Sequence, residues 1–188
     1  MFRELFPSSR NLFQYRDVVA CARSLNRVTV VLPASRLAML TGQISGHLIK
    51  MVMDSIGWDG SDYRIHLDND LAYGVLLCAV TTSAYLDVRQ RGFDVRGVRY
   101  EDLVERPLDM CRVLMEYCGL PLSLAELAVK AMDFDSQRNS ISSRASVGQY
   151  TEQQLPSKTK EQLNKLLTKY ELPLIGEPNV LDGTLSCS

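Results

Sequence analysis

Two short stretches of the sequence predict strands that are followed directly by charged residues. Asn11–Tyr15 is followed by Arg16, and Phe93–Tyr100 is followed by Glu101. The amphipathic sequence after each strand predicts a helix. In open α/β sheets, ligands bind at the turns that follow the carboxyl ends of parallel strands. This pattern predicts a ligand-binding turn at Arg16, and Tyr100 is expected either to contact a ligand or only to end its strand.

Helical patterns account for much of the remaining chain, which favours a single α/β domain. Val28–Leu32 fits either a short strand or the lead-in to a helix. Ser123 and Glu126 have the spacing of a capping box at the start of a helix that ends near Met132. Phe134–Gln153 is polar and predicts a long loop. The other expected helices are Arg36–Ile56, Asp68–Gln90, Arg106–Cys118 and Ser157–Tyr170.

Composition and charge argue against several classes of function. The net charge is −1, so the chain as a whole gives no electrostatic argument for nucleic-acid binding. There are five cysteines without CxxC spacing and only two histidines, so we expect no metal site and interpret the cysteines as reduced thiols. No apolar run is long enough for a membrane span, and the first residues lack the apolar core of a signal peptide.

Three segments resemble parts of the sulfotransferase family. FPSSRNLFQYRDVVACARSL resembles the segment around the 3′-phosphate site of these enzymes, and DSQRNSISSRAS resembles a Ser- and Arg-rich loop near their C-terminus. The most specific match is GVRYEDLVERPLDMCRVLMEYCGLP, from Gly97 to Pro121. The resemblance implies a three-layer α/β fold with a parallel sheet like that of P-loop NTPases. It also implies transfer of a sulfuryl group from 3′-phosphoadenosine 5′-phosphosulfate to a hydroxyl or amine.

The resemblance also implies which residues bind the nucleotide. Arg16 would hold the 3′-phosphate of the donor, and guanidinium suits this role because it binds phosphate bidentately and stays charged. Cys21 stands near the position of a family serine, and Ser24 lies close enough to substitute for it. Tyr100 would contact the adenine. Arg138 and Ser140 would close over the 3′-phosphate from the loop.

Each of these residues also has a plainer interpretation, which the sequence leaves open. Arg16 is adjacent to Asp17, so it can instead form an ion pair with that residue or another acid at the strand end. Tyr100 can pack on Leu103 as the last residue of a strand. Cys21 fits a small buried apolar site, and Arg138 fits a solvated loop. Glu101 and Asp102 are interpreted as charges that lead into the next helix.

Part of the family's machinery has no counterpart in these residues. No GxxxxGK[ST]-like stretch occurs, and the family's phosphosulfate loop and general-base histidine precede the segment where the match begins. His47 and His66 therefore cannot be carried over as the base. We expect residues 1–188 to match the C-terminal two-thirds of a sulfotransferase domain, with residues 134–153 as the loop that closes on the ligand. The open alternative is a non-catalytic remnant or interaction module that retains partial nucleotide binding.

The resemblance sets the remaining expectations about partners. The co-substrate would be 3′-phosphoadenosine 5′-phosphosulfate, and the acceptor a small molecule or a glycan whose identity the sequence does not give. A nucleotide or small-molecule kinase of related fold is disfavoured because the phosphate loop of that class is also missing from the sequence. The reduced thiols favour the cytoplasm. A Golgi location would require an anchoring segment before Met1.

Overall fold

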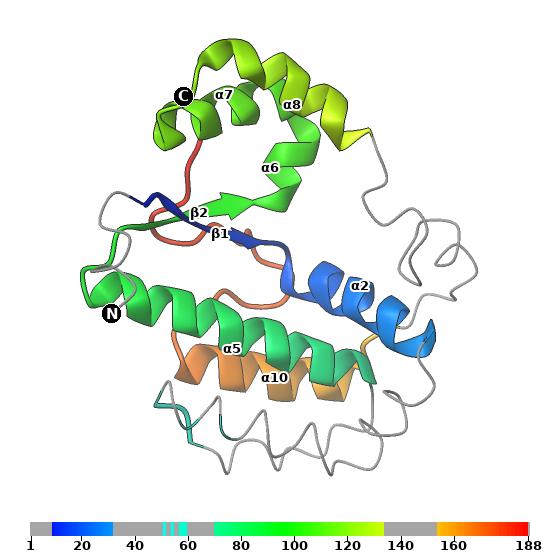
Figure 1. Ribbon diagram of the computed structural model, residues 1–188. Helices are drawn as coiled ribbons and strands as arrows, with labels where there is room; N and C mark the ends of the chain where they lie inside the picture. Colours follow the sequence, from blue (N-terminus) through cyan, green and yellow to red (C-terminus); the bar gives the residue numbers. More distant parts are fainter. Residues whose placement is uncertain are drawn as a thin grey trace. The chain divides into compact units, whose positions relative to one another are not determined.

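The computed structural model describes residues 9–31, 51, 54, 57–59, 70–133 and 154–187. Within these residues the chain forms two parallel strands, six α-helices and one 3₁₀ turn. The fold class is therefore α/β, as the alternation of strand and helix patterns predicted. Figure 1 shows the elements along the chain. The expected helix Arg36–Ile56, both histidines, Arg138, Ser140 and the expected loop 134–153 lie outside the described residues, apart from a few isolated positions of that helix.

The chain divides into two compact units. The first contains Met1–Arg16, Tyr85–Phe134 and Val180–Ser188, and the second contains Asp17–Ala84 and Asp135–Asn179. The division falls within one continuous helix, α5 (Asp70–Gln90). The expectation of a single domain over residues 1–188 stays a prediction.

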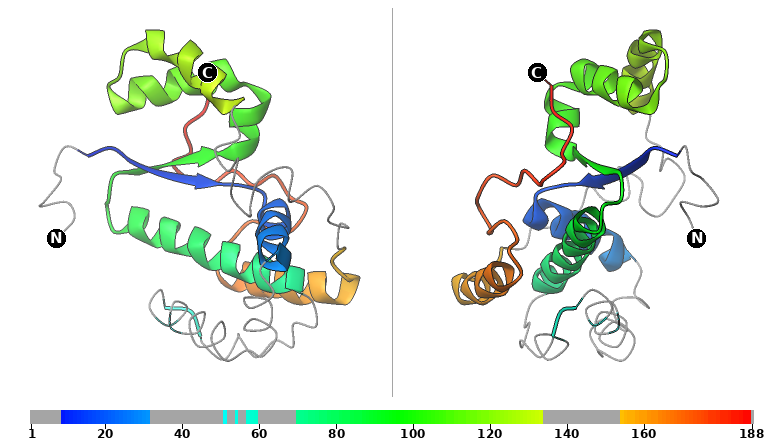
Figure 2. Two further views of the ribbon diagram at one scale, coloured as in Figure 1. Left: turned by 45° about the vertical axis from the view of Figure 1, so that its right-hand side comes forward. Right: turned by 90° about the vertical axis from the view of Figure 1, so that its left-hand side faces the viewer.

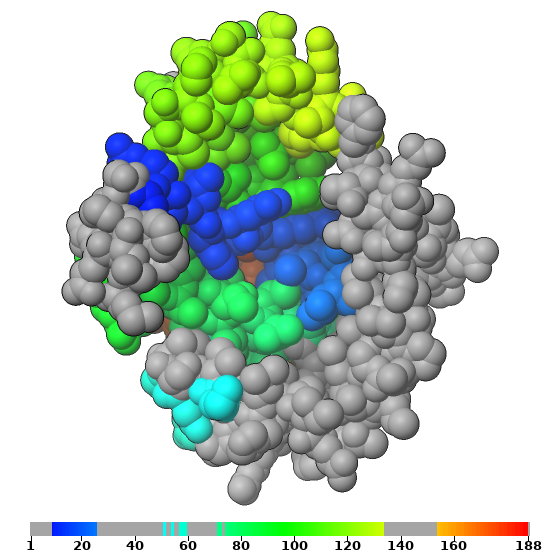
Figure 3. Space-filling model, in the orientation of Figure 1, coloured from blue at the N-terminus to red at the C-terminus, as the bar shows by residue number. Residues whose placement is uncertain are grey.

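The sheet of the first unit consists of β1 (Asn11–Tyr15) and β2 (Val95–Arg99), which pair in parallel. Asn11 lies opposite Val95 and Tyr15 lies opposite Arg99. The two strands stay side by side in both views of Figure 2. The bounds of β1 match the predicted strand. Leu12 and Gln14 are exposed and only Tyr15 of the strand is buried, and atoms of β1 are visible at the surface in Figure 3. A shared register means that both strands end at the same edge of the sheet.

An aromatic core and the C-terminal segment hold this sheet in place. Tyr15, Tyr85 and Leu181 are buried together, and Phe13 stacks on Tyr85 with ring centroids 4.6 Å apart. The Tyr15 hydroxyl accepts a hydrogen bond from the backbone N–H of Leu181 at 3.1 Å. It also shares a 2.7 Å hydrogen bond with Thr184 Oγ1. These contacts tie the last residues of the chain to the strand that precedes Arg16.

Three helices follow β2 in the first unit. They are α6 (Tyr100–Glu105), α7 (Pro107–Cys118) and α8 (Ala125–Met132). Arg106 separates α6 from α7 because a residue before proline disfavours the helical region, and its backbone is not helical (φ −133°, ψ 61°). Gly119 ends α7 in the left-handed conformation (φ 68°) that glycine adopts without strain. The predicted helix Arg106–Cys118 is confirmed to within one residue.

The second unit packs α2 (Val18–Val31), the first part of α5 and α10 (Ser157–Lys169). Its buried side chains include Ala22, Val75, Leu76, Leu163 and Leu167. Outside these helices, Trp58 stacks on Tyr170 with ring centroids 3.7 Å apart and donates its indole N–H to Ser83 Oγ at 2.8 Å. The expected helix Ser157–Tyr170 is confirmed to within one residue, and the expected helix Asp68–Gln90 is confirmed over its described part, Asp70–Gln90.

The structure decides one open alternative and shows that one local prediction is wrong. The strand considered at Val28–Leu32 is excluded because α2 continues to Val31, and Val28 follows Leu25 at a helical spacing. The predicted capping box at Ser123 does not form. Ser123 lies inside the 3₁₀ turn η2 (Leu122–Leu124), and Leu124 precedes α8 without any side-chain cap. Because Ser123 is part of the 3₁₀ turn, it does not occupy the N-cap position of α8.

We expect Arg89 to stabilise the first unit more than any exposed ion pair. Arg89 Nη1 donates to the carbonyl of Val95 at 2.8 Å, while its Nε and Nη2 donate to Asp182. Only 19% of its side chain is exposed. Arg89→Met should lower the free energy of unfolding by about 1–3 kcal/mol, because the Val95 carbonyl and Asp182 lose a charged donor. Urea unfolding followed by circular dichroism measures this change.

Arg91→Met is the matched control for that substitution. Arg91 directly follows the same helix, but its partner Asp87 lies four residues earlier and 63% of the Arg91 side chain is exposed. Such a pair contributes at most about 0.5 kcal/mol. Equal effects of the two substitutions would contradict the role assigned to Arg89.

Candidate functional site

The candidate site lies where β1 and β2 end, within the first unit. Arg16 is the residue after β1, and Tyr100 is the residue after β2 and the first of α6. Because Tyr15 pairs with Arg99, the parallel register brings Arg16 and Tyr100 to equivalent positions on neighbouring strands. The carboxyl edge of a parallel sheet is the usual ligand position in open α/β folds. Two of the predicted site residues therefore meet at the predicted kind of place.

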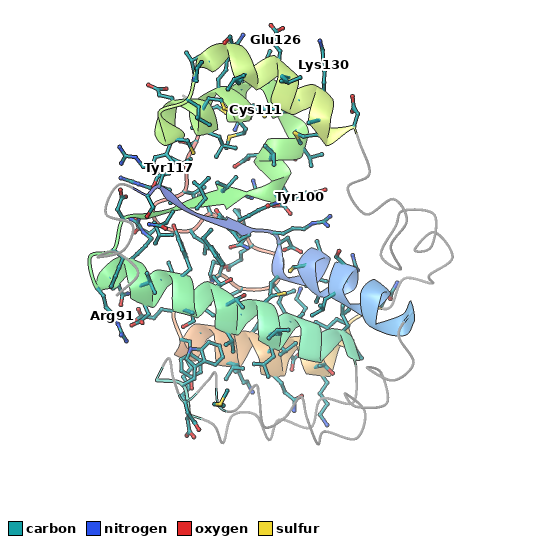
Figure 4. The ribbon with its side chains drawn as sticks, viewed as in Figure 1. Arg91, Tyr100, Cys111, Tyr117, Glu126 and Lys130 are labelled. Atoms are coloured by element: carbon teal, nitrogen blue, oxygen red, sulfur yellow. The ribbon has the colours of Figure 1, made fainter. Side chains whose placement is uncertain are left out.

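Arg16 stacks on Tyr100. The central carbon of the Arg16 guanidinium lies 4.7 Å from the centroid of the Tyr100 ring, which is within the range of a cation–π contact. Tyr100 is labelled in Figure 4, at the start of α6. The plainer interpretation of Tyr100 as a residue that only ends its strand is incomplete, because its ring holds a guanidinium. A cation over an aromatic ring presents both parts that a nucleotide needs, a charge for phosphate and a flat surface for a base.

A series of ion pairs, in which arginines and carboxylates alternate, begins at Arg16. Glu101 lies between two arginines, with Oε1 3.6 Å from Arg16 Nε and Oε2 3.6 Å from Arg99 Nε. Arg99 Nη1 donates to Asp102 Oδ1 at 3.3 Å, and Arg106 Nη2 lies 3.8 Å from the same oxygen. We call these five residues the Arg16–Arg106 cluster. Its three guanidinium groups outnumber its two carboxylates, so the cluster carries one formal positive charge.

The exposure of the cluster favours an anionic ligand. The side chains of Arg16 and Arg106 are 40% and 47% exposed, whereas those of Glu101 and Asp102 are 22% and 16% exposed. An approaching anion therefore meets guanidinium groups before it meets carboxylates. The Arg16–Glu101 distance of 3.6 Å is an ion pair but exceeds the usual length of a hydrogen bond. A phosphate that binds Arg16 bidentately would form shorter, stronger contacts than this pair provides.

Local sequence explains why these side chains stay at the strand end. Glu101 and Asp102 lie in the first turn of α6, where acidic residues interact favourably with the exposed backbone N–H groups. Asp17, the residue after Arg16, accepts a 2.8 Å hydrogen bond from the backbone N–H of Ala20 and so caps α2. The ion pair expected as an alternative for Arg16 exists, with Glu101 as a partner at the strand end.

The other predicted site residues belong to the second unit or lie outside the described residues. Cys21 and Ser24 lie on α2 in the second unit, where Cys21 is half-buried and Ser24 is exposed. Arg138 and Ser140 lie outside the described residues. The proposed roles of these four residues stay predictions.

Sequence reasoning missed two members of the Arg16–Arg106 cluster and underrated two others. Arg99 and Arg106 were not considered, and Glu101 and Asp102 were interpreted only as helix lead-in charges. One signal was present, because Arg99, Asp102 and Arg106 are spaced by three and four residues, the spacing of side chains that meet on a helix. The contact between Arg16 and Glu101 had no such signal because it depends on the register of the two strands.

The side chains of Arg16 and Arg106 at the site are partly exposed to solvent. The second unit has a cavity lined by Val18, Leu167 and Leu174 among others, but its volume of about 10 Å³ has room for about one water molecule. In the described ranges there is no group of three or more His, Cys, Asp or Glu side chains that would hold a metal ion. No helix in the same residues is both long and apolar enough to cross a membrane.

Comparisons with known proteins found no relative of this chain. No family model matches the chain, and neither the curated proteins nor the solved structures include a match.

Proposed function

We propose that this chain is a sulfotransferase-like protein that binds the adenosine 3′,5′-bisphosphate part of 3′-phosphoadenosine 5′-phosphosulfate at the carboxyl ends of β1 and β2. The observation that carries the proposal is the stacking of Arg16 on Tyr100, with 4.7 Å between guanidinium and ring. The resemblance to sulfotransferases implied nucleotide roles for both residues from separate parts of the sequence, 84 positions apart. Their meeting supports a shared ligand.

In the proposed complex the two residues divide the nucleotide between them. The Arg16 guanidinium donates two N–H groups to oxygens of the 3′-phosphate, since its planar fork matches phosphate geometry. The Tyr100 ring stacks on the adenine, a contact worth about 1–3 kcal/mol in other proteins that stack bases on aromatic side chains. Arg106, the most exposed arginine of the cluster, adds long-range attraction for the anion.

The transfer step needs groups beyond this cluster. A hydroxyl or amine of the acceptor attacks sulfur, the bond between sulfur and the bridging phosphate oxygen breaks, and a base accepts the acceptor's proton. A glycine-rich phosphate loop with a lysine would stabilise the charge on the leaving phosphate, and residues 1–188 contain no such sequence. This observation favours a second candidate function, in which the chain binds the nucleotide without turnover.

A thermal-shift series tests the nucleotide chemistry. Adenosine 3′,5′-bisphosphate at about tenfold above its dissociation constant should stabilise the chain by about 1.4 kcal/mol, because the ligand binds only the folded state. For a chain of this length the melting temperature should then rise by about 3–6 °C. Adenosine 5′-monophosphate and inorganic phosphate, tested at the same concentration, should each give a smaller rise.

The same series separates the outcomes. If adenosine and the 5′-monophosphate stabilise the chain as much as the bisphosphate does, the 3′-phosphate is not recognised and the role of Arg16 is wrong. Incubation with donor labelled in its sulfuryl group then distinguishes the two candidate functions. Labelled product from a panel of hydroxyl and amine acceptors supports transfer, and its absence together with nucleotide binding supports the non-catalytic alternative.

A further inference from the structure

Helices α2 and α5 touch at a point where one of them has no side chain. A Cβ atom built on Gly74 of α5 would lie 2.8 Å from Cβ and 3.0 Å from Cα of Ala22 on α2. Ala22 itself is fully buried. Glycine permits such a close approach of backbones because it has no Cβ. Within the second unit, the two helices are therefore fixed against each other at this crossing.

Two cysteines flank this crossing, one on each helix. Cys21 is the neighbour of Ala22, and Cys78 lies one helical turn after Gly74. The Cys21 side chain interacts with the Cys78 thiol and raises the pKa of that thiol. Neither thiol is part of a disulfide, and both residues are half-buried. Residues on either side of so close a helix crossing lie within reach of disulfide geometry, in which the two Cα atoms are usually about 4.4–6.8 Å apart.

We propose that Cys21 and Cys78 form a reversible disulfide that fastens α2 to α5. The oxidant would be a low-molecular-weight disulfide such as glutathione disulfide. The proposal concerns the stability of the second unit and does not depend on nucleotide binding.

The exchange proceeds in two steps that balance. The Cys21 thiolate attacks one sulfur of glutathione disulfide, forms a mixed disulfide and releases one glutathione thiolate. Cys78 then loses its proton and attacks the Cys21 sulfur, so that the second glutathione leaves as a thiolate. The two released thiolates take up the two protons that the cysteines lost. The protein loses two electrons and the glutathione disulfide gains them.

The local chemistry sets the order of these steps. The interaction with Cys21 raises the pKa of the Cys78 thiol, and burial raises it further. Cys21 is therefore the thiol that attacks first, and Cys78 resolves the mixed disulfide. Formation of the pair closes a long loop of the chain, which constrains the unfolded state.

Peptide mapping of the intact chain tests the proposal. The chain is incubated in a series of glutathione redox buffers, its remaining thiols are alkylated, and tryptic peptides are analysed by mass spectrometry. Trypsin separates all five cysteines, with Cys21 in Asp17–Arg23 and Cys78 in Ile65–Arg89. We expect these two peptides to be joined at least about tenfold more often than either is joined to the peptides of Cys118 or Cys187. The oxidised chain should melt at least about 5 °C higher, and dithiothreitol should reverse the change.

Variants keep the outcome decisive. In Cys78→Ala, Cys21 should stop at the mixed disulfide with glutathione, whereas Cys118→Ala should form the joined peptides as the native chain does. Circular dichroism checks that both variants fold, and the map of the native chain decides the matter if one does not. Alkylation of Cys21 and Cys78 as thiols in buffers that oxidise Cys118 and Cys187 would overturn the proposal.

Discussion

Arg16→Ala is expected to weaken the binding of adenosine 3′,5′-bisphosphate by roughly 30–100-fold. The substitution removes the guanidinium that stacks 4.7 Å from the Tyr100 ring and that, in the proposed complex, holds the 3′-phosphate. Hydrogen bonds to charged groups contribute about 1.5–3 kcal/mol, and about 1.4 kcal/mol corresponds to a factor of ten in affinity. Arg16→Lys should give an intermediate loss because it keeps the charge without the bidentate fork. Titration calorimetry of each variant measures the change.

The first unit offers a matched control at the opposite end of the same strand. Arg10 precedes β1, lies 5.7 Å from the ring centroid of Tyr117 and is 3.6 Å from an oxygen of Asp94. Arg10 thus has the same kinds of neighbour as Arg16, an aromatic ring and a carboxylate, but lies away from the carboxyl edge of the sheet. Figure 4 labels Tyr117 and Tyr100 toward opposite ends of the sheet. Arg10→Ala should change the affinity less than about twofold. Similar losses of nucleotide affinity in both variants would indicate that the nucleotide is attracted to arginine side chains in general and is not bound specifically at Arg16.

Gly97→Val is expected to cause the largest loss of stability among single substitutions in β2. A Cβ at this position would lie 3.0 Å from both Thr184 Oγ1 and the Tyr85 hydroxyl, and 3.1 Å from Cε1 of Tyr15. These side chains are held by hydrogen bonds to one another or to the C-terminal segment, so they have little room to move. Overpacking and the displacement of a hydrogen bond both lower the free energy of unfolding. Their sum exceeds the stability gained by replacing a glycine in a strand, so we expect a net loss of about 3 kcal/mol.

Arg96→Val introduces the same side chain at the preceding position of β2. Arg96 is exposed, and valine is a favourable residue for a strand, so we expect a change within about 0.5 kcal/mol. Urea unfolding of the two variants gives the comparison. A Gly97→Val variant as stable as Arg96→Val would show that the C-terminal segment does not pack on Gly97 as described.

Local patterns were enough to predict most of the elements of the fold. The apolar run of β1 and the Pro and Gly residues that bound α7 act over a few neighbouring positions, so their elements were found to within one residue. The capping box at Ser123 failed because a 3₁₀ turn and a capped helix start compete for the same short sequence. The strand considered at Val28 failed because short apolar runs fit either period.

The candidate site was predictable only in part. Arg16 and Tyr100 could be named from the sequence, but their contact depends on the pairing of Tyr15 with Arg99, which is set by tertiary structure. The same holds for Glu101, whose partner Arg16 is remote in the sequence. The closeness of Cys21 and Cys78 depends on a helix crossing at Gly74 that no periodicity reveals.

Isothermal titration calorimetry of the native chain with adenosine 3′,5′-bisphosphate tests the central claim most directly. We predict saturable binding of one nucleotide per chain with a dissociation constant below about 1 mM, which corresponds to about −4 kcal/mol. The affinity should fall as salt is added, because the site is electrostatic and partly exposed. Absence of binding heat at millimolar nucleotide, at more than one temperature, would contradict the assignment of Arg16 and Tyr100 to a nucleotide site.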